Sequence, residues 1–153
     1  MVYIRQAAVQ DVRILSELAY ASKAYWGYDE AFMEACREDL TITEAHLTAA
    51  QLFVVEENRQ IQGFIALEQE LSQRDRGLVT YLFIHPNAIG RGYGQALWNR
   101  MVDAARDSGI RAVLVHSDPH AEPFYVRMGA RRIGEVASTV FPDRHLPVLE
   151  TIV

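Results

Sequence analysis

The sequence predicts one α/β domain built on a mixed sheet. The 153 residues suit a single domain, and no repeat or Pro/Gly/Ser-rich linker divides them, so we expect residues 1–153 to form one unit. Half the residues are hydrophobic and 23% are charged, a balance typical of a folded globular chain. Strand-like and helix-like segments follow in the order β-α-α-β-β-β-α-β-α-β-β, with about seven strands and about four helices.

The first part of the chain is predicted to hold a short strand, at residues 2–6, and two helices. Asp11 can cap the first helix, whose apolar face comprises Ile14, Leu15, Leu18, Ala19 and Ser22. The second helix is expected to begin near Asp29 and to bury Phe32, Met33, Cys36 and Leu40. Thr43 can cap one further short turn that runs through His46.

Three strands and a long helix are predicted next. Residues 51–56 and 61–70 flank a polar turn, and a more apolar strand at 78–84 ends at His85-Pro86, because proline cannot continue the sheet pairing. A helix is predicted over 92–107, with Ala96, Leu97, Met101, Val102 and Ala105 on its apolar face. Gly109 is expected just beyond the end of this helix.

The last part returns to the sheet. Residues 110–116 predict a strand buried on both faces. A short helix over about 122–128 ends at Gly129, and two strands at 132–138 and 146–152 complete the sheet. Meandering strands followed by a helical crossover favour a mixed, mostly antiparallel, twisted sheet.

Charge and composition exclude several function classes. The net charge is −5, which argues against a nucleic-acid partner, and the apolar run at 78–84 is too short to span a membrane. The first six residues lack a secretory pattern, and Cys36 is the only cysteine, so we expect a reducing, cytoplasmic location. Lys23 is the only lysine, and nothing around it in the sequence suggests Schiff-base chemistry.

Three glycines separate the apolar strand at 78–84 from the helix that follows. Gly90, Gly92 and Gly94 allow close backbone approach, and successive amides at a helix N-terminus favour an anion. Arg91 adds a full positive charge. The spacing lacks the Gly-Lys-Ser/Thr of a P-loop and the G-x-G-x-x-G of a dinucleotide site, so the turn predicts a pyrophosphate cradle of another kind.

This turn resembles motif A of the GNAT acyltransferase superfamily, Gln/Arg-x-x-Gly-x-Gly/Ala, with Ile89 in place of the expected Gln or Arg. A second block, residues 118–130, resembles motif B of the same superfamily. Ala121, Phe124, Tyr125 and Gly129 are in register, whereas Asp118 replaces an Asn and Ala130 replaces a Phe. Together the two blocks identify the chain as similar to GNAT domains and imply the GNAT-type fold.

The resemblance implies acetyl-CoA as co-substrate and no metal. It implies that the backbone of strand residues 82–84 pairs with the pantetheine arm and that the turn at 90–95 holds the pyrophosphate. The implied CoA-binding residues are Leu82, Phe83, Ile84, Ile89, Gly90, Arg91, Gly92, Tyr93, Gly94, Gln95, Asp118, Phe124 and Tyr125. Tyr125 takes the position of the family's general acid, which protonates the departing thiolate. Family members often pair, so a homodimer is a further expectation.

The general base is left open. The family's usual basic positions correspond here to Leu78, Thr80 and Val113, none of which is a strong base. Glu68 and His116 are the first candidates. Glu70, Glu30, Glu34 and a water relay are the alternatives.

The acceptor is expected to be a primary amine of a small molecule or peptide. Tyr25, Trp26 and Tyr28 lie where the two first helices meet, and aromatic faces can hold a cation, with Glu30 nearby. Residues 144–147 are expected on the other side of the acceptor pocket. Small metabolites, polyamines, antibiotics, amino acids and protein N-termini all stay open.

The sequence also bears on a metal site, a nucleophilic thiol and a non-catalytic function. The spacing His116-x-Asp118-x-His120 suits a metal in principle, but no further ligand is evident, so no metal is predicted. Cys36 lies on an apolar helix face and is not expected to act as a nucleophile. A non-catalytic acyl-CoA-binding or regulatory module is the alternative function.

Overall fold

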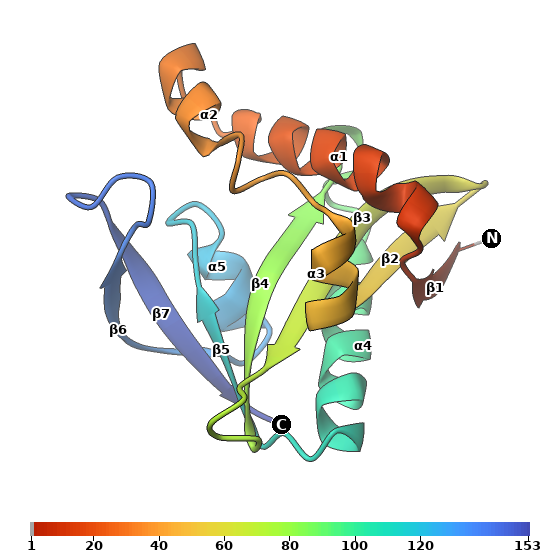
Figure 1. The fold of residues 1–153 in the computed structure, drawn as a ribbon, viewed down its shortest axis with the longest axis vertical. Helices are drawn as coiled ribbons and strands as arrows, with labels where there is room; N and C mark the ends of the chain where they lie inside the picture. Colours follow the sequence, from red (N-terminus) through yellow and green to blue (C-terminus); the bar gives the residue numbers. More distant parts are fainter. Residues whose placement is uncertain (1) are drawn as a thin grey trace.

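The computed structural model describes residues 2–153 as a seven-stranded sheet with helices on both faces (Figure 1). The strands are β1 (Val2–Gln6), β2 (Gln51–Glu57), β3 (Gln60–Gln69), β4 (Arg76–Ile84), β5 (Ala112–His116), β6 (Arg131–Ala137) and β7 (His145–Ile152). The helices are α1 (Val12–Ala24), α2 (Glu30–Cys36), α3 (Glu44–Ala49), α4 (Tyr93–Asp107) and α5 (Glu122–Arg127), with 3₁₀ turns η1 (Val9–Asp11) and η2 (Pro86–Ala88). The predicted mixed α/β fold is confirmed, and α3 is a helix where only a turn was expected.

The sheet order is β1-β2-β3-β4-β5-β7-β6, and every neighbouring pair is antiparallel except β4 and β5. Strand β7 follows β6 in the chain but lies between β5 and β6. The one parallel pair is connected through α4, as a parallel pair requires a crossover.

Two local predictions for α1 were wrong. Asp11 does not cap α1; it ends η1, where its carboxylate accepts a hydrogen bond from the Ala8 amide (2.8 Å) and contacts the Arg5 guanidinium (2.8 Å). Ile14 was placed on the buried face but is 49% exposed. By contrast, Asp29 caps α2 as predicted, since its side chain accepts from the Phe32 amide at 2.7 Å.

Each face of the sheet carries its own core. Against α4 and α5 pack Phe53, Val55, Ile65, Leu67, Val79, Val113, Val115 and Leu149. Against α1, α2 and the segment that follows α2 pack Leu52, Val54, Phe64 and Ala66. The strict alternation along β2 and β3 follows from the two-residue period of a strand. We call these the α4 face and the α1 face of the sheet.

The sheet divides beyond a short parallel ladder. Residues Arg76–Val79 of β4 pair with Ala112–Val115 of β5, and the pairing stops there. On the other edge of β4, Ala66 of β3 pairs with Tyr81 and Leu67 pairs with Val79, which leaves Thr80 as the extra residue of a bulge. A bulge bends and twists its strand. From this point β4 and β5 diverge, as Figure 1 shows.

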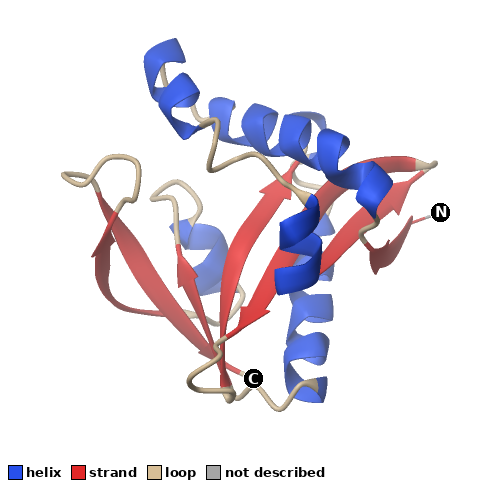
Figure 2. Cartoon of the chain, in the orientation of Figure 1, coloured by secondary structure: helices blue, strands red, loops and turns tan. Residues whose placement is uncertain are grey.

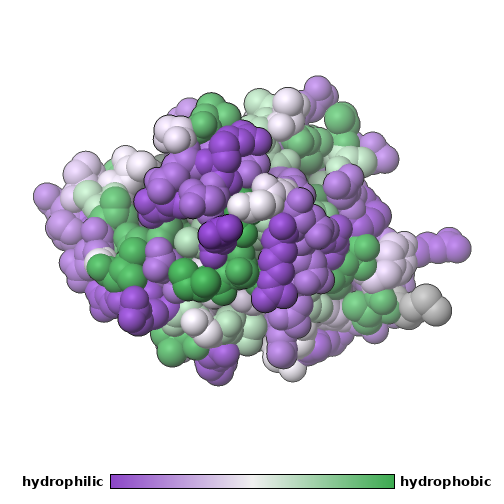
Figure 3. Space-filling view, turned by 90° about the horizontal axis from the view of Figure 1, so that it is seen from below, coloured by the Kyte–Doolittle hydropathy of each residue, from purple (hydrophilic) through white to green (hydrophobic). Residues whose placement is uncertain are grey.

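Polar and charged side chains cover much of the face seen in Figure 3, with apolar groups in smaller patches between them. Among residues 2–153, no helix has both the length and the apolar character needed to cross a bilayer.

Candidate active site

A cavity of about 1010 Å³ lies where β4 and β5 diverge. Its walls include fifteen of the residues singled out from the sequence: Trp26, Glu68, Leu82, Phe83, Ile84, Ile89, Gly90, Gly92, Tyr93, Gly94, Gln95, His116, Asp118, Phe124 and Tyr125. Four others, Tyr25, Tyr28, Glu30 and Arg91, do not line it. The β5–α5 and β6–β7 loops lie on the same side of the molecule as α2, beyond the point where β4 and β5 diverge (Figure 2). Asp118 and Arg144 of these loops line the cavity, and we call this end its open end.

The strand period divides the cavity between the two faces of the sheet. Leu82 and Ile84 of β4 pack with the α4-face core, whereas Tyr81 and Phe83 pack with the α1-face core. His116 follows Val115, an α4-face residue, so it belongs to the α1 face. Glu68 follows Leu67 in the same way and also belongs to the α1 face. The cavity therefore offers an apolar side toward α4 and α5 and a more polar side toward α1.

The glycine-rich turn forms a row of free amide donors. Gly90 and Gly92 have φ angles of +85° and +84°, in the left-handed region that favours glycine. Within residues 2–153, no acceptor bonds to the backbone amides of residues 90–95; the first bond of α4 is from Ala96 to the Gly92 carbonyl (3.1 Å). Successive free amides at the start of a fifteen-residue helix are suited to an anionic group such as a pyrophosphate.

The turn is packed against α5 through Gly94. A Cβ atom at Gly94 would lie 3.0 Å from Phe124 Cε1 and 3.2 Å from Cζ, so a side chain there would require the ring to shift by a few tenths of an ångström. Tyr93 turns away, with its ring in the core and its hydroxyl donating to Glu57. Tyr93 thus lines the cavity with little of its side chain, and Arg91 is exposed outside it.

Tyr125 is 5% exposed and lines the cavity from α5. Its ring packs against Trp98 (centroids 5.6 Å apart) and Phe124 (5.4 Å), which fix its direction. Burial, reinforced by the negative charge of Asp118, raises the pKa of the Tyr125 hydroxyl well above its ordinary value. The side chain is therefore a proton donor at neutral pH.

The two candidate bases lie on the same face of the sheet. Glu68 pairs with Leu78, and Leu78 pairs with Leu114, so Glu68 lies at the closed end of the divergence. His116 ends β5, two residues beyond Leu114, and is exposed. Neither side chain makes a hydrogen bond or ion pair within the described chain, so both are open to the cavity.

Asp118 is the centre of an ionic cluster at the open end of the cavity. Its Oδ2 accepts from Lys23 Nζ (3.1 Å), the Tyr28 hydroxyl (2.8 Å) and Arg144 Nη2 (3.4 Å). Its Oδ1 accepts from the His120 amide (2.9 Å) and contacts His120 Nδ1 (2.9 Å). Burial opposes ionisation, but these donors and charges outweigh it and hold the pKa of Asp118 far below its usual range.

Tyr28 was expected to offer its ring to a substrate cation, but the chain's own cations lie over it. Lys23 Nζ is 5.2 Å and Arg144 Cζ is 5.2 Å from the centroid of the Tyr28 ring. Trp26 lines the cavity and stacks on His120 (5.1 Å, 7°). Tyr25 and Glu30 are exposed away from the cavity.

Sequence reasoning missed His46 and Tyr81 as cavity residues. The Thr43 amide donates to His46 Nδ1 (2.9 Å), so that nitrogen carries the lone pair and the proton of a neutral ring is on Nε2. Tyr81 donates to the Asp39 carbonyl (3.0 Å) and lies 3.4 Å from His46 Nε2. His46 is therefore a donor toward the cavity and not a base. The sequence indicated Thr43 as a helix cap, and the amide of this residue fixes the tautomer of His46. It gave no sign that His46 and Tyr81 line the cavity.

Neither the metal nor the thiol alternative gains support. Over residues 2–153, no three His, Cys, Asp or Glu side chains are grouped so as to share a metal ion. Cys36 is buried in the α1-face core, and burial raises the pKa of its thiol.

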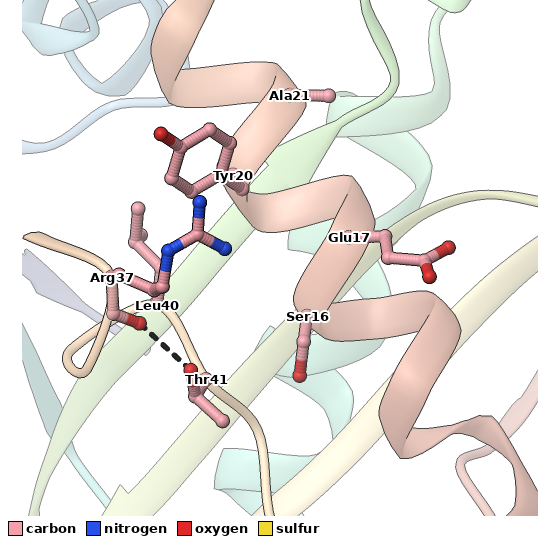
Figure 4. Close-up of a pocket in the computed structure, with 7 residues that line it drawn as sticks. All are labelled: Ser16, Glu17, Tyr20, Ala21, Arg37, Leu40 and Thr41. Atoms are coloured by element: carbon pink, nitrogen blue, oxygen red, sulfur yellow. Dashed lines mark hydrogen bonds between the residues drawn. The ribbon is translucent and has the colours of Figure 1, made fainter. Parts of the chain in front are cut away.

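A second, smaller hollow of about 240 Å³ lies between α1 and the segment after α2 and shares Leu40 with the large cavity (Figure 4). Arg37 lies over the Tyr20 ring there (4.4 Å), and the Thr41 hydroxyl donates to the Arg37 carbonyl at 2.7 Å. The pairing of Arg37 with Glu34 (2.6 Å) satisfies its charge, and the hollow holds no group free for chemistry.

The family profile of the acetyltransferase (GNAT) domain matches residues 9–139, most of the chain. The chain belongs to the GNAT acetyltransferase family. No curated protein matches the sequence.

Solved structures share the GNAT fold at low sequence identity. PaiA N-acetyltransferase from Thermoplasma acidophilum, in complex with coenzyme A, is 15% identical with a TM-score of 0.83, covering 100% of this chain and 99% of that one. A GCN5-related N-acetyltransferase from Rhodopseudomonas palustris is 18% identical (TM-score 0.81; 99% and 95% covered). An acetyltransferase from Thermus thermophilus is 16% identical (TM-score 0.71; 100% and 97% covered). The GNAT domain described here thus has the same architecture along its whole length.

Proposed function

We propose that this GNAT-family protein is an N-acetyltransferase that moves an acetyl group from acetyl-CoA to a primary amine of a small molecule or peptide. The observation that carries the proposal is the row of free amides at residues 90–95, at the edge of the cavity between the diverging strands. The family assignment and the neighbour that holds coenzyme A support it.

The residues present fit the co-substrate. The amides of the glycine-rich turn would hold the pyrophosphate. Ile84 and Phe124 on the α4 side, together with the exposed Ile89, offer apolar surface for the pantetheine arm. The backbone of β4 beyond Val79 has no partner on the β5 side, so its polar groups there can bind a ligand amide. When bound, acetyl-CoA supplies the thioester that the amine nitrogen attacks.

Groups of the chain itself would then stabilise the developing charge and transfer the protons. A backbone amide of β4 aimed at the carbonyl oxygen would stabilise the negative charge that develops there during attack. Tyr125, protonated and facing the cavity, would donate its proton to the departing thiolate. Glu68 or His116, on the α1 face, would take the proton of the attacking amine, directly or through water.

Calorimetric titration tests the first step. The folded protein should bind acetyl-CoA and CoA with micromolar affinity and should not bind NAD, which shares a pyrophosphate but lacks pantetheine. Absence of binding by a folded sample would exclude the proposal. Binding without thiol release in the presence of any amine would replace it with the non-catalytic acyl-CoA-binding module.

A further inference from the structure

The open end of the cavity holds two cations and one half-buried carboxylate. The side chains of Lys23, Asp118 and Arg144 are 15%, 17% and 23% exposed, and all three residues line the cavity. Among residues 2–153, Asp118 is the only carboxylate within ion-pair distance of either cation, so these three side chains together carry one positive charge in excess. A partly buried excess charge attracts an ion of opposite sign from the cavity.

Lys23 and Arg144 both have N–H donors that make no hydrogen bond within the described chain. Within the described chain, Arg144 donates only through Nη2, to the Tyr28 hydroxyl (2.6 Å) and to Asp118 (3.4 Å), so Nε and Nη1 are free. Lys23 uses one of its three protons, on Asp118. No buried side-chain nitrogen or oxygen in this part of the chain lacks a partner, so the free donors are reachable from solvent or from the cavity. Nε and Nη1 lie on different edges of the guanidinium, so each can donate one hydrogen bond to an oxygen of a carboxylate, and the two remaining protons of Lys23 add further donors.

Aromatic rings hold both cations in place before any ligand arrives. Tyr28, Phe32 and Phe141 form a stack, with centroids 4.1 Å and 4.7 Å apart. Lys23 and Arg144 each lie within 5.7 Å of the Tyr28 and Phe32 centroids. Because the rings already restrict both long side chains, fixing them around a ligand costs less conformational entropy.

The acidic residues of the cavity lie elsewhere or are already engaged. Glu68 is at the closed end of the divergence, on the α1 face. Asp39 is exposed, and its carboxylate accepts from the Thr139 hydroxyl at 3.0 Å instead of pairing with Lys23 or Arg144. The open end of the α1 side thus holds Lys23 and Arg144 close around Asp118, with the Asp39 carboxylate bonded to the β6–β7 loop, and the free carboxylate of Glu68 is at the closed end.

We propose that the acceptor is an amine that also carries a carboxylate, as a free amino acid does, and that Arg144 and Lys23 bind this carboxylate. The inference rests on the proposed function. The carboxylate would lie at the open end of the cavity, and the amine would point along the α1 face toward β4 and Glu68. Arg144 and Lys23 are in this reading the residues that determine acceptor specificity.

Matched acceptors test the proposal. CoA release from acetyl-CoA is measured with the common L-amino acids and with their carboxamides, which keep the amine and the side chain but lose the charge. We expect at least one amino acid to exceed its carboxamide in kcat/KM by tenfold or more. Arg144→Gln should lower kcat/KM for that amino acid by about 10- to 100-fold, mainly through KM, and the loss should be at least tenfold smaller for the carboxamide. Lys23→Met should also lower kcat/KM more for the amino acid than for its carboxamide.

Arg13→Gln is the matched control. Arg13 is an exposed arginine on α1 that pairs, among residues 2–153, only with Glu17. Its substitution should therefore leave kcat/KM unchanged for both the amino acid and the carboxamide. Arg144→Lys keeps the charge with fewer N–H donors, so its kcat/KM for the amino acid should fall between those of wild type and Arg144→Gln. An unchanged Kd for acetyl-CoA verifies that each variant is folded.

The outcomes separate the two proposals. Carboxamides or carboxylate-free amines used as well as amino acids, or an Arg144→Gln loss equal for both members of a pair, would overturn the carboxylate site and leave the acetyltransferase function standing. No CoA release with any amine, despite binding of acetyl-CoA, would remove both.

Discussion

Tyr125 is the residue whose surroundings define its chemistry most sharply. Burial and the nearby Asp118 charge raise the pKa of its hydroxyl, so the phenol keeps its proton through the neutral range. An unperturbed thiol titrates near ~8.5, so a CoA thiolate formed beside Tyr125 is the weaker base of the two conjugate anions. Proton transfer from Tyr125 is therefore uphill as an isolated step and depends on its coupling to departure of the thiolate.

Tyr125→Phe tests this role. The substitution keeps the ring that packs on Trp98 and Phe124, so the fold and the binding of acetyl-CoA should be kept. Loss of the proton donor should lower kcat by about 100-fold, the usual scale for an acid–base group. Steady-state CoA release, with the Kd for acetyl-CoA measured alongside, separates the two effects. A change in kcat below twofold would remove Tyr125 from the role of acid.

The sequence could predict Tyr125 and the glycine turn because each lies within a local motif. It could not predict the partners of Asp118, because Lys23 and Tyr28 are 95 and 90 positions away in the chain. The motif suggested a contact with CoA for this carboxylate, whereas its oxygens in the structure accept from the protein's own donors. Only the folded chain reveals that the expected aromatic site for a substrate cation is covered by Lys23 and Arg144.

At the level of elements, the conformation of the turn before α4 depends on the left-handed backbone of Gly92. We expect Gly92→Ala to cost about 1 kcal/mol of stability, because alanine is strained at a φ of +84°. It should also weaken acetyl-CoA binding by about tenfold, because the amides of the cradle would be redirected. Denaturant unfolding and calorimetric titration measure the two effects.

Gly134 in β6 supplies the comparison. Its φ lies outside the left-handed region, and a Cβ there would meet no atom within 4 Å. Gly134→Ala should leave the Kd for acetyl-CoA unchanged. Equal Kd values for Gly92→Ala and wild type would contradict a ligand-binding role for the turn.

Arg5 adds an ionic cluster to the backbone pairing that joins β1 to β2. Arg5 joins Asp11 of η1 (2.8 Å) and Glu56 of β2 (2.6 Å), carboxylates whose side chains are only 8% and 10% exposed. Arg5→Gln would leave two carboxylates without their shared cation. We expect a loss of about 2 kcal/mol near neutral pH, below the value for a fully buried pair because Arg5 is partly exposed.

This loss should depend on pH in a definite direction. Arg5 lowers the pKa of Asp11, and Tyr3 together with Arg5 lowers that of Glu56. A lowered folded-state pKa stabilises the protein above the unfolded values of about 3.9 and 4.3, and the effect is lost as pH falls through the folded values. Urea unfolding should therefore show the gap between wild type and Arg5→Gln narrowing from about pH 6 to about pH 3. A constant gap would argue against this linkage.

The elements themselves were largely predictable, and the errors have local causes. The order of strands and helices and the glycines that end α4 and α5 follow from periodicity and turn chemistry. A carboxylate at the start of a helix can cap the helix or pair with an arginine from another element. The prediction for Asp11 was wrong because its carboxylate pairs with Arg5 of β1. The bulge at Thr80 has no mark in the sequence, since it appears only when β3 and β4 are in register.

For the whole molecule, a ligand between β4 and β5 would connect the two parts of the sheet. The β1–β4 part and the β5–β7 part are joined through four residue pairs. Acetyl-CoA at about 100 times its Kd should add about 2.7 kcal/mol of stability, and so raise Tm by about 5–10 °C. Thermal unfolding with and without ligand measures the shift. A Tm unmoved by saturating ligand would conflict with binding at this junction, and Gly92→Ala at the same concentration should show a smaller rise.

The position of β7 has a consequence for synthesis on the ribosome. β6 pairs only with β7, and β5 has β7 as its second neighbour, although β7 is made after both. Until residues 145–152 have left the ribosome, β6 has no strand to pair with and the outer edge of β5 stays open to other chains. The nascent protein can assemble β1 to β4 early, but the wall of the cavity that carries His116 is secured only by the last strand. A chain in which β7 has not yet paired would be prone to aggregation through the unpaired edge of β5.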